Sequence, residues 1–171
     1  MQQPLIFTAK LGWGSRIITA GVALILAAVA FAMIFAVAEE SQTTKTVMYV
    51  VAALVLALPL TAAYLYSPVQ YELTEEALII RRRRASVVIR ISDMVSVDYL
   101  NPSFLQDMAR TGGNGGVFGI YGDFAAGRDR YQLYLTQSRN TILITTRTGE
   151  KFVISPDDRH IVSVLRTRIQ G

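Results

Sequence analysis

Cysteine is missing from the 171-residue sequence, and His160 is its single histidine. Without cysteine there is no disulfide, no thiolate nucleophile and no cysteine-ligated zinc or iron–sulfur site, which fits a reducing compartment. One imidazole leaves little from which to build a metal cluster or an acid–base pair. The composition therefore predicts neither a metal site nor a bound cofactor.

The sequence also has little that supports catalysis. His160 stands among acids and an arginine in a predicted helix, where a solvated side chain is the simplest interpretation. Asp157 and Asp158 are explained as helix-start residues, and no base stands beside a nucleophile. We expect no catalytic residues and a protein that is not an enzyme.

A glycine-rich run, GGNGG at residues 112–116, lacks the Lys-Ser/Thr pair of a phosphate-binding loop and opens a strand rather than a helix. We interpret it as a bent structural loop, in which valine at position 115 or 116 lowers stability if the glycine needs a positive φ. The segment before it, from Asn101 to Arg110, is either a short helix or a mobile excursion. The role of residues 101–116 stays open.

Charged residues are absent from two long apolar runs, residues 17–38 and 46–66. Each run is long enough to cross about 30 Å of hydrocarbon as a helix. The short segment 39–45 between them makes the pair a transmembrane hairpin. Because neither span carries an ionisable group, an ion path, a proton relay or a transporter site is not expected.

Basic residues flank this hairpin on one side. Lys10 and Arg16 precede the first run, an arginine run follows the second, and the 39–45 loop has two acids and one base. The positive-inside rule then places both termini in the cytoplasm and the loop outside. The predicted arrangement is a cytoplasmic tail at 1–16, a multi-pass anchor in the cytoplasmic (inner) membrane, and a cytoplasmic domain at 67–171.

A cleavable signal peptide is the alternative for the first run. Ala36-Val37-Ala38 before Glu39 has the small-residue spacing of a cleavage site. The apolar run is longer than the usual signal core of about 7–15 residues, and a second span follows closely. Cleavage between Ala38 and Glu39 stays open, and either outcome leaves the domain inside.

From Ser67 onward the hydrophobic period changes from helical to two, which is typical of half-buried strands. Val69, Tyr71 and Leu73 alternate with polar residues, and a turn at 74–77 leads into the next strand, so a hairpin is predicted. Further strands are predicted at 86–90, 94–100, 117–124, 131–136, 141–146 and 151–154, with Gly149 in the turn between the last two. Many short strands imply a sandwich or a partly open barrel.

The last segment returns to helical periodicity. Ser155 is a good N-cap, and Pro156 suits the first helical position. The apolar residues that follow, Ile161, Val162, Leu165 and Ile169, share one helix face. Three arginines lie on the opposite face. One amphipathic helix is predicted to close the β domain.

Three stretches resemble the bacterial pleckstrin-homology-like (bacterial PH) family. YELTEEALIIRRRR at 71–84 looks like its opening hairpin, GGNGGVFGIYGDF at 112–124 like its glycine–aromatic signature, and KFVISPDD at 151–158 like its last strand and helix start. The resemblance covers roughly residues 69–166. It implies a PH-like β-sandwich or partly open barrel capped by one C-terminal α-helix, in a family often tethered to membranes, and it implies no reaction. The acidic hairpin tip Glu75-Glu76 argues against the phosphoinositide pocket of eukaryotic PH domains.

The candidate site is the run Arg81, Arg82, Arg83 and Arg84. Antiparallel pairing across the predicted turn sets Arg81 opposite Gln70 and Arg82 opposite Val69, close to the end of the second span. We therefore predict lipid-headgroup contact by the four arginines, each contributing about 1 kcal/mol against an anionic leaflet. A topology signal and the solvated end of a strand are the other interpretations of the run.

These patterns favour a membrane-anchored binding or assembly module, whose PH-like domain contacts protein partners, copies of itself or the anionic membrane surface. The alternative is a regulatory or sensor subunit of a larger membrane complex. The expected partners are the lipid bilayer, an anionic phospholipid, and a second copy or another membrane protein. Nucleic acid is not expected, because the positive excess is small and the aromatics alternate as core residues do. The sequence leaves open which partner or lipid binds and the oligomeric state.

Overall fold

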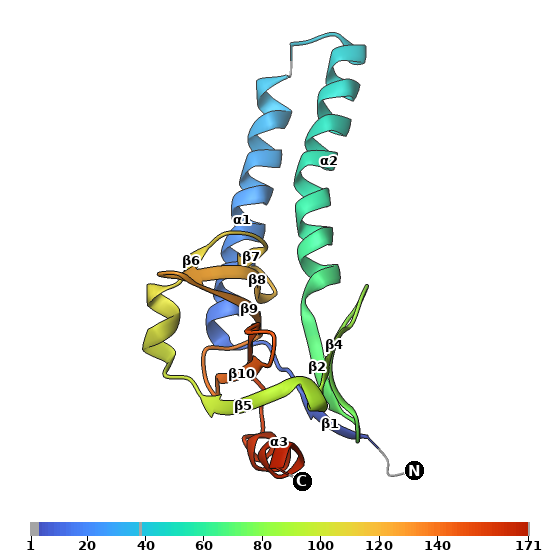
Figure 1. Ribbon diagram of the computed structural model, residues 1–171. Coiled ribbons are helices and arrows are strands. Elements are labelled where there is room, and N and C mark those ends of the chain that lie inside the picture. The colour runs from blue at the N-terminus through green and yellow to red at the C-terminus, as the bar shows by residue number, and fades with distance from the viewer. Residues whose placement is uncertain (1–3, 38, 171) are drawn as a thin grey trace.

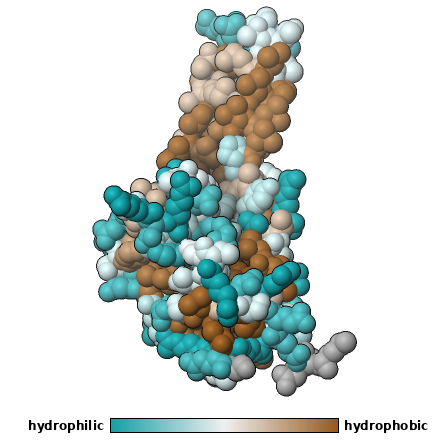
Figure 2. All heavy atoms as spheres, viewed as in Figure 1, coloured by the Kyte–Doolittle hydropathy of each residue, from teal (hydrophilic) through white to brown (hydrophobic). Residues whose placement is uncertain are grey.

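The computed structural model describes residues 4–37 and 39–170. Two long helices, α1 (Trp13–Ala36) and α2 (Gln42–Tyr66), run antiparallel and project from one end of a β-rich domain (Figure 1). Both are long and apolar enough to cross a membrane, and 0% of the most apolar stretch of each is buried. Figure 2 shows a hydrophobic band over these helices, between a hydrophilic tip and the domain. The exposed apolar surface makes them unlike core helices of a soluble domain.

Both helices begin one turn before the apolar runs that predicted them. They begin at Trp13 and Gln42, whereas the uncharged runs begin at residues 17 and 46. Ser41 caps α2, because its Oγ accepts a hydrogen bond of 3.2 Å from the Thr44 amide. Pro59 lies inside α2, which continues past it to Tyr66.

The N-terminal segment forms a strand of the domain, which the sequence pattern did not predict. Strand β1 (Leu5–Thr8) pairs antiparallel with β2 (Pro68–Leu73), with Leu5 opposite Leu73 and Thr8 opposite Gln70. The Thr8 hydroxyl also donates to an Asp157 carboxylate oxygen at 2.6 Å. Both described ends of the chain therefore lie in the domain, away from the helical tip (Figure 1).

Strands β1 and β2 continue into β3 (Ala77–Arg82) and β4 (Val87–Arg90), which gives a four-stranded sheet in that order. The predicted pairing of Gln70 with Arg81 is present in the β2–β3 hairpin. A bulge at Val69 then shifts the register, so that Arg82 lies opposite Pro68 rather than Val69.

The second sheet holds the remaining strands, in the order β5-β10-β11-β9-β8-β6, with β7 paired to β8. Their bounds are Met94–Tyr99 (β5), Ala109–Arg110 (β6), Asn114–Gly116 (β7), Gly119–Ala126 (β8), Asp129–Leu135 (β9), Ile142–Thr146 (β10) and Lys151–Ile154 (β11). Strands β9 and β11 pair in parallel, and the other pairs are antiparallel. Gly149 takes a φ of 84° in the β10–β11 turn, as its position predicted.

The main core joins the two sheets to the C-terminal helix α3 (His160–Gln170). Tyr71 of β2 is completely buried at its centre: its hydroxyl donates to the Tyr134 carbonyl at 2.7 Å and accepts from the Ser155 amide at 3.1 Å. The short helices η1 (Ile91–Asp93) and η2 (Pro102–Asp107) complete the domain. Phe104 of η2 packs on Tyr131, with ring centroids 5.5 Å apart, so the segment after Asn101 is a packed helix.

Helix α3 begins at His160, so the prediction that Ser155 caps it is wrong. The Ser155 hydroxyl instead accepts hydrogen bonds from the Thr136 and Gln137 amides, at 3.0 and 3.3 Å. The helix buries its predicted apolar face, led by Ile161, Val162 and Leu165. A mainly β domain of two sheets that do not close into a barrel, capped by one C-terminal helix, confirms the predicted fold class.

Candidate lipid-headgroup site at the end of α2

The domain supplies hydrogen-bond donors to the last turn of α2. The last four carbonyl groups of a helix have no partner within the helix. The Ala63 carbonyl accepts from the Tyr121 hydroxyl at 2.6 Å, and the Leu65 carbonyl accepts from the Arg84 amide at 3.1 Å. The Tyr64 carbonyl accepts from the Ser67 hydroxyl at 2.9 Å and from Arg83 Nη1 at 3.3 Å. Strand β8 and the loop after β3 are thereby attached to the end of α2.

Arg83 and Arg84 lie against the aromatic residues that end this helix. The Arg83 guanidinium lies 3.9 Å from the centre of the Tyr64 ring, and its Nη1 donates to Ser67 Oγ at 2.8 Å. The Arg84 guanidinium lies 5.9 Å from the Tyr66 ring centre. Cations are favourable at the negative end of the helix dipole, and their contact with ring faces adds to this. Two of the predicted site residues therefore join the domain to α2.

Arg81 points to the face of β3 opposite to that of Arg82, because side chains alternate along a strand. Its Nε lies 2.6 Å from a Glu72 carboxylate oxygen on β2, and its side chain is about half exposed (46%). Solvent screens the half-exposed arginine, so this ion pair contributes only modestly to stability. Arg81 does not reach the residues around Tyr66 that the other three arginines contact.

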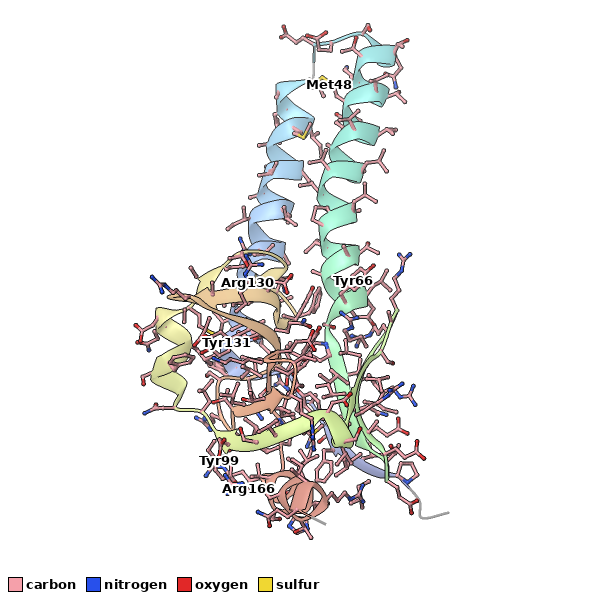
Figure 3. The ribbon with its side chains drawn as sticks, in the orientation of Figure 1. Met48, Tyr66, Tyr99, Arg130, Tyr131 and Arg166 are labelled. Atoms are coloured by element: carbon pink, nitrogen blue, oxygen red, sulfur yellow. The ribbon has the colours of Figure 1, made fainter. Side chains whose placement is uncertain are left out.

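Arg82 lies on the same face of β3 as the buried Ile80, because side chains alternate along a strand. Its guanidinium lies close to two aromatic rings, 5.6 Å from the centre of Tyr66 and 5.5 Å from that of Tyr134. Its Nε donates to the Ala85 carbonyl at 2.6 Å. Figure 3 labels Tyr66 at this junction between α2 and the domain.

A cavity of about 600 Å³ opens beside Arg82, between α2 and the β8–β9 hairpin. The helix contributes a wall of small or apolar residues and one ring: Pro59, Ala62, Ala63 and Tyr66. Their spacing of three and four places them on one helix face. The sheet contributes Tyr121 opposite Tyr134 and Asp123 opposite Gln132, which share a face because they alternate along the strands.

Burial raises the pKa of Tyr121 to about 12, although a hydrogen bond with Asn114 and the charge of Arg82 oppose the shift. The pKa of Tyr134 is raised by burial as well, while Arg82 lowers it and Asp123 raises it. Both hydroxyls are therefore protonated at neutral pH. Tyr121 remains a donor to α2, and Tyr134 donates to Gln132 Oε1 at 3.1 Å.

The loop between β7 and β8 packs against both helices. The Phe118 amide donates to Thr19 Oγ1 of α1 at 3.0 Å, and the Phe118 ring meets Tyr64 of α2 edge-on at 5.5 Å. Gly116 lies against Ile18 of α1. The glycine run is thus part of the contact between the domain and the hairpin.

The other candidate residues lie away from the cavity. His160 is exposed at the start of α3, and its Nδ1 is 3.2 Å from Ser163 Oγ. Within residues 4–37 and 39–170, no group of three or more His, Cys, Asp or Glu side chains is placed to hold a metal ion. Sequence reasoning missed Tyr121, Asp123, Gln132 and Tyr134. Their only signal was alternation within two predicted strands, which does not reveal what the polar face meets.

A two-sheet β domain capped by a C-terminal helix, with an apolar helical hairpin inserted between its strands β1 and β2, belongs to the PH-like class of binding modules. Residues 69–168, more than half of the chain, match the bacterial PH domain family, and the protein belongs to that family. The match begins directly after α2, so it includes neither β1 nor the two helices. No curated protein and no solved structure shows a significant match.

Proposed function

We propose that this protein is a membrane-anchored binding and assembly module. Helices α1 and α2 cross the cytoplasmic membrane, and the bacterial PH domain lies against the cytoplasmic headgroups. The attachment of the domain to α2 carries this proposal. Because three of the last four carbonyls of α2 are bonded to the domain or to Ser67, the domain follows the position and tilt of that helix.

The position of the N-terminal strand supports the same topology. Residues 5–8 pair with β2, so the N-terminal tail and the domain lie on one side of the hairpin. Lys10 and Arg16 are on that side with Arg81 to Arg84, and Glu39 and Glu40 are at the far tip. Signal cleavage after Ala38 would remove β1 and α1. Ala38 itself lies outside the described residues.

The arginine run supports a location at the headgroups. Arg82, Arg83 and Arg84 gather around the last turn of α2, where a spanning helix meets the membrane surface. Arg81 is the neighbouring residue on β3, and its side chain is half exposed. Contact with anionic lipid adds about 1 kcal/mol per residue, which orients a domain that the helices already attach.

Single-cysteine variants test this arrangement, because the chain has no other cysteine. Glu40→Cys should react with a membrane-impermeant maleimide in intact cells, whereas Ser163→Cys on α3 should react only after permeabilisation. A nitroxide at Ser86→Cys, next to the arginine run, should be more accessible to oxygen and less to a water-soluble nickel complex than one at Ser163→Cys. Labelling of Ser163→Cys from outside would overturn the topology, and equal accessibility at 86 and 163 would overturn the headgroup location.

A regulatory or sensor subunit of a larger membrane complex is the second candidate function. An apolar groove of about 490 Å³ runs between the helices, lined by residues that include Ala30, Met33, Tyr49 and Leu56. Such a groove accepts a lipid tail or a helix of another membrane protein. Co-purification in mild detergent separates the two functions: a stoichiometric membrane partner supports the subunit, and self-association alone supports the module.

A further inference from the structure

We propose that the cavity between α2 and the β8–β9 hairpin binds a phospholipid headgroup that carries both a phosphate and a primary ammonium group. Arg82 takes the phosphate, and Asp123 takes the ammonium. This inference rests on the proposed function, since a lipid reaches the cavity only if α2 crosses the membrane. It extends the proposed function by naming the chemical class of the ligand and the residues that select that ligand.

Arg82 is held ready to bind an anion. Its guanidinium lies over the rings of Tyr66 and Tyr134, at 5.6 and 5.5 Å from their centres, and its Nε donates to the Ala85 carbonyl, so these three contacts restrict its position. Its Nη1 and Nη2 atoms have no hydrogen-bond partner among the residues that the structure describes. The free edge of a guanidinium presents two parallel N–H groups, which match two oxygens of a phosphate.

Asp123 brings an opposite charge to the same cavity. It faces Gln132 across the β8–β9 pair, and its carboxylate has no hydrogen-bond or ion-pair partner within the described part of the chain. Arg82 and Asp123 both act on the pKa of Tyr134, in opposite directions, so both lie near that ring. They are nevertheless not within the 4.0 Å of a salt bridge. Two unpaired opposite charges in one cavity fit a ligand that carries both charges itself.

The surroundings of Asp123 suit an ammonium group rather than a second phosphate. The Gln132 side-chain oxygen accepts hydrogen bonds, as it does from Tyr134, and tyrosine ring faces attract cations. A headgroup with a net negative charge would place its second polar group against the carboxylate. A quaternary ammonium lacks the N–H groups that a carboxylate and an amide oxygen accept. A phosphoethanolamine headgroup has no net negative charge, and its primary ammonium has N–H groups to donate, so it fits this part of the cavity.

The helix wall provides the path for the rest of the lipid. Pro59, Ala62 and Ala63 leave space along α2, and the stretch from Pro59 to Tyr66 covers about 10 Å of helix at 1.5 Å per residue. The glycerol and the first methylenes of the acyl chains can lie on this apolar wall, with the headgroup at the level of Tyr66. The cavity volume of about 600 Å³ is sufficient for a headgroup and glycerol.

Native mass spectrometry of the full-length protein in detergent, with added dioleoyl lipids, tests the proposal. Phosphatidylethanolamine should bind more tightly than phosphatidylcholine or phosphatidylglycerol of the same chains. Arg82→Gln should weaken binding of phosphatidylethanolamine about tenfold, as expected for the loss of one charge-assisted hydrogen bond. Asp123→Asn should abolish the preference for phosphatidylethanolamine over phosphatidylglycerol. Arg90→Gln, at the end of β4 opposite Ala77 and away from the arginine run, and Asp107→Asn on η2 are the matched controls and should change neither quantity.

Equal binding of the three lipids, or an unchanged preference in Asp123→Asn, would overturn the proposal. Asp123 is exposed, so this variant should fold even if Arg82→Gln does not, and thermal unfolding checks both. Displacement of the lipid by equimolar soluble phosphoethanolamine would show that the ligand is not a lipid. If the label at position 86 lies at the headgroups but no lipid preference is found, this inference fails alone. If that label lies in water, the proposed function fails with it.

Discussion

The Tyr121 hydroxyl donates a hydrogen bond of 2.6 Å to the main-chain carbonyl of Ala63. Tyr121 belongs to β8, which lies next to the edge strand β6 of the larger sheet, and Ala63 belongs to the last turn of α2. The bond thus joins the sheet that contributes Asp123 and Tyr134 to the helix that contributes Tyr66. It also satisfies a carbonyl that the helix itself leaves without a partner.

Tyr121→Phe should therefore destabilise the protein, since it leaves the Ala63 carbonyl without a donor. A buried acceptor without a partner costs about 1–3 kcal/mol, and we expect a value near the lower end because the ring remains in place. Chemical unfolding in detergent micelles measures the loss. Tyr99→Phe is the control, because the Tyr99 hydroxyl is exposed and its contact with the Arg159 carbonyl is 3.4 Å long. Equal losses of unfolding free energy in Tyr121→Phe and Tyr99→Phe would show that the bond to the Ala63 carbonyl does not stabilise the protein.

Strand positions were readable from the sequence because alternation is a local signal. The β2–β3 register followed from a tight turn, and Arg81 pairs with Gln70 as predicted. Pairing between distant segments was not readable, since nothing in the four residues Leu5–Thr8 indicates that they join β2 across an intervening hairpin. The parallel pairing of β9 with β11 depends on the whole topology in the same way.

The candidate site was predictable only in its charges. Composition and register predicted the arginine run and its place near the end of α2. They did not predict the different contacts that the individual arginines make. One arginine pairs with Glu72, one donates to the Tyr64 carbonyl and one lines a cavity. These contacts depend on the bulge at Val69 and on where β8 and β9 lie. Ser155 shows the same limit: its side chain has the chemistry of an N-cap, and tertiary contacts with Thr136 and Gln137 take it instead.

Gly116 is the glycine of the 112–116 run whose substitution tests the contact with α1, whereas a Cβ at Gly113 would meet the backbone of Tyr121 and Gly122 within the domain. Its φ is 149°, and a Cβ there would lie 2.8 Å from Ile18 Cδ1 of α1. Gly116→Ala should cost about 1–2 kcal/mol in unfolding free energy, because strain and the clash with α1 combine. Gly115→Ala is the matched control, since its Cβ would meet only the flexible end of Arg110 at 3.3 Å. A larger loss in Gly115→Ala than in Gly116→Ala would contradict the packing of this loop on α1.

The buried hydroxyl of Tyr71 predicts a loss of stability at high pH. Complete burial raises the pKa of Tyr71 to about 12 from 10.0, and the nearby charge of Asp157 adds to the shift, while the hydrogen bonds with Ser155 oppose it. The folded state therefore holds the phenolic proton more tightly than the unfolded state. This contribution is fully present below about pH 10 and is lost as the pH rises through the folded pKa. At 1.36 kcal/mol per pKa unit, the loss between pH 10 and 12 approaches roughly 2–3 kcal/mol.

Tyr71→Phe separates this effect from the titration of the other tyrosines. The variant should be less stable than the parent protein at pH 8, because the Tyr134 carbonyl and the Ser155 amide both lose the hydroxyl. The difference between the two proteins should then shrink as the pH rises from 10 to 12, since only the parent has the phenolic proton to lose. Unfolding free energies in detergent at each pH measure this. A difference that stays constant to pH 12 would show that Tyr71 does not release its proton on unfolding in this range.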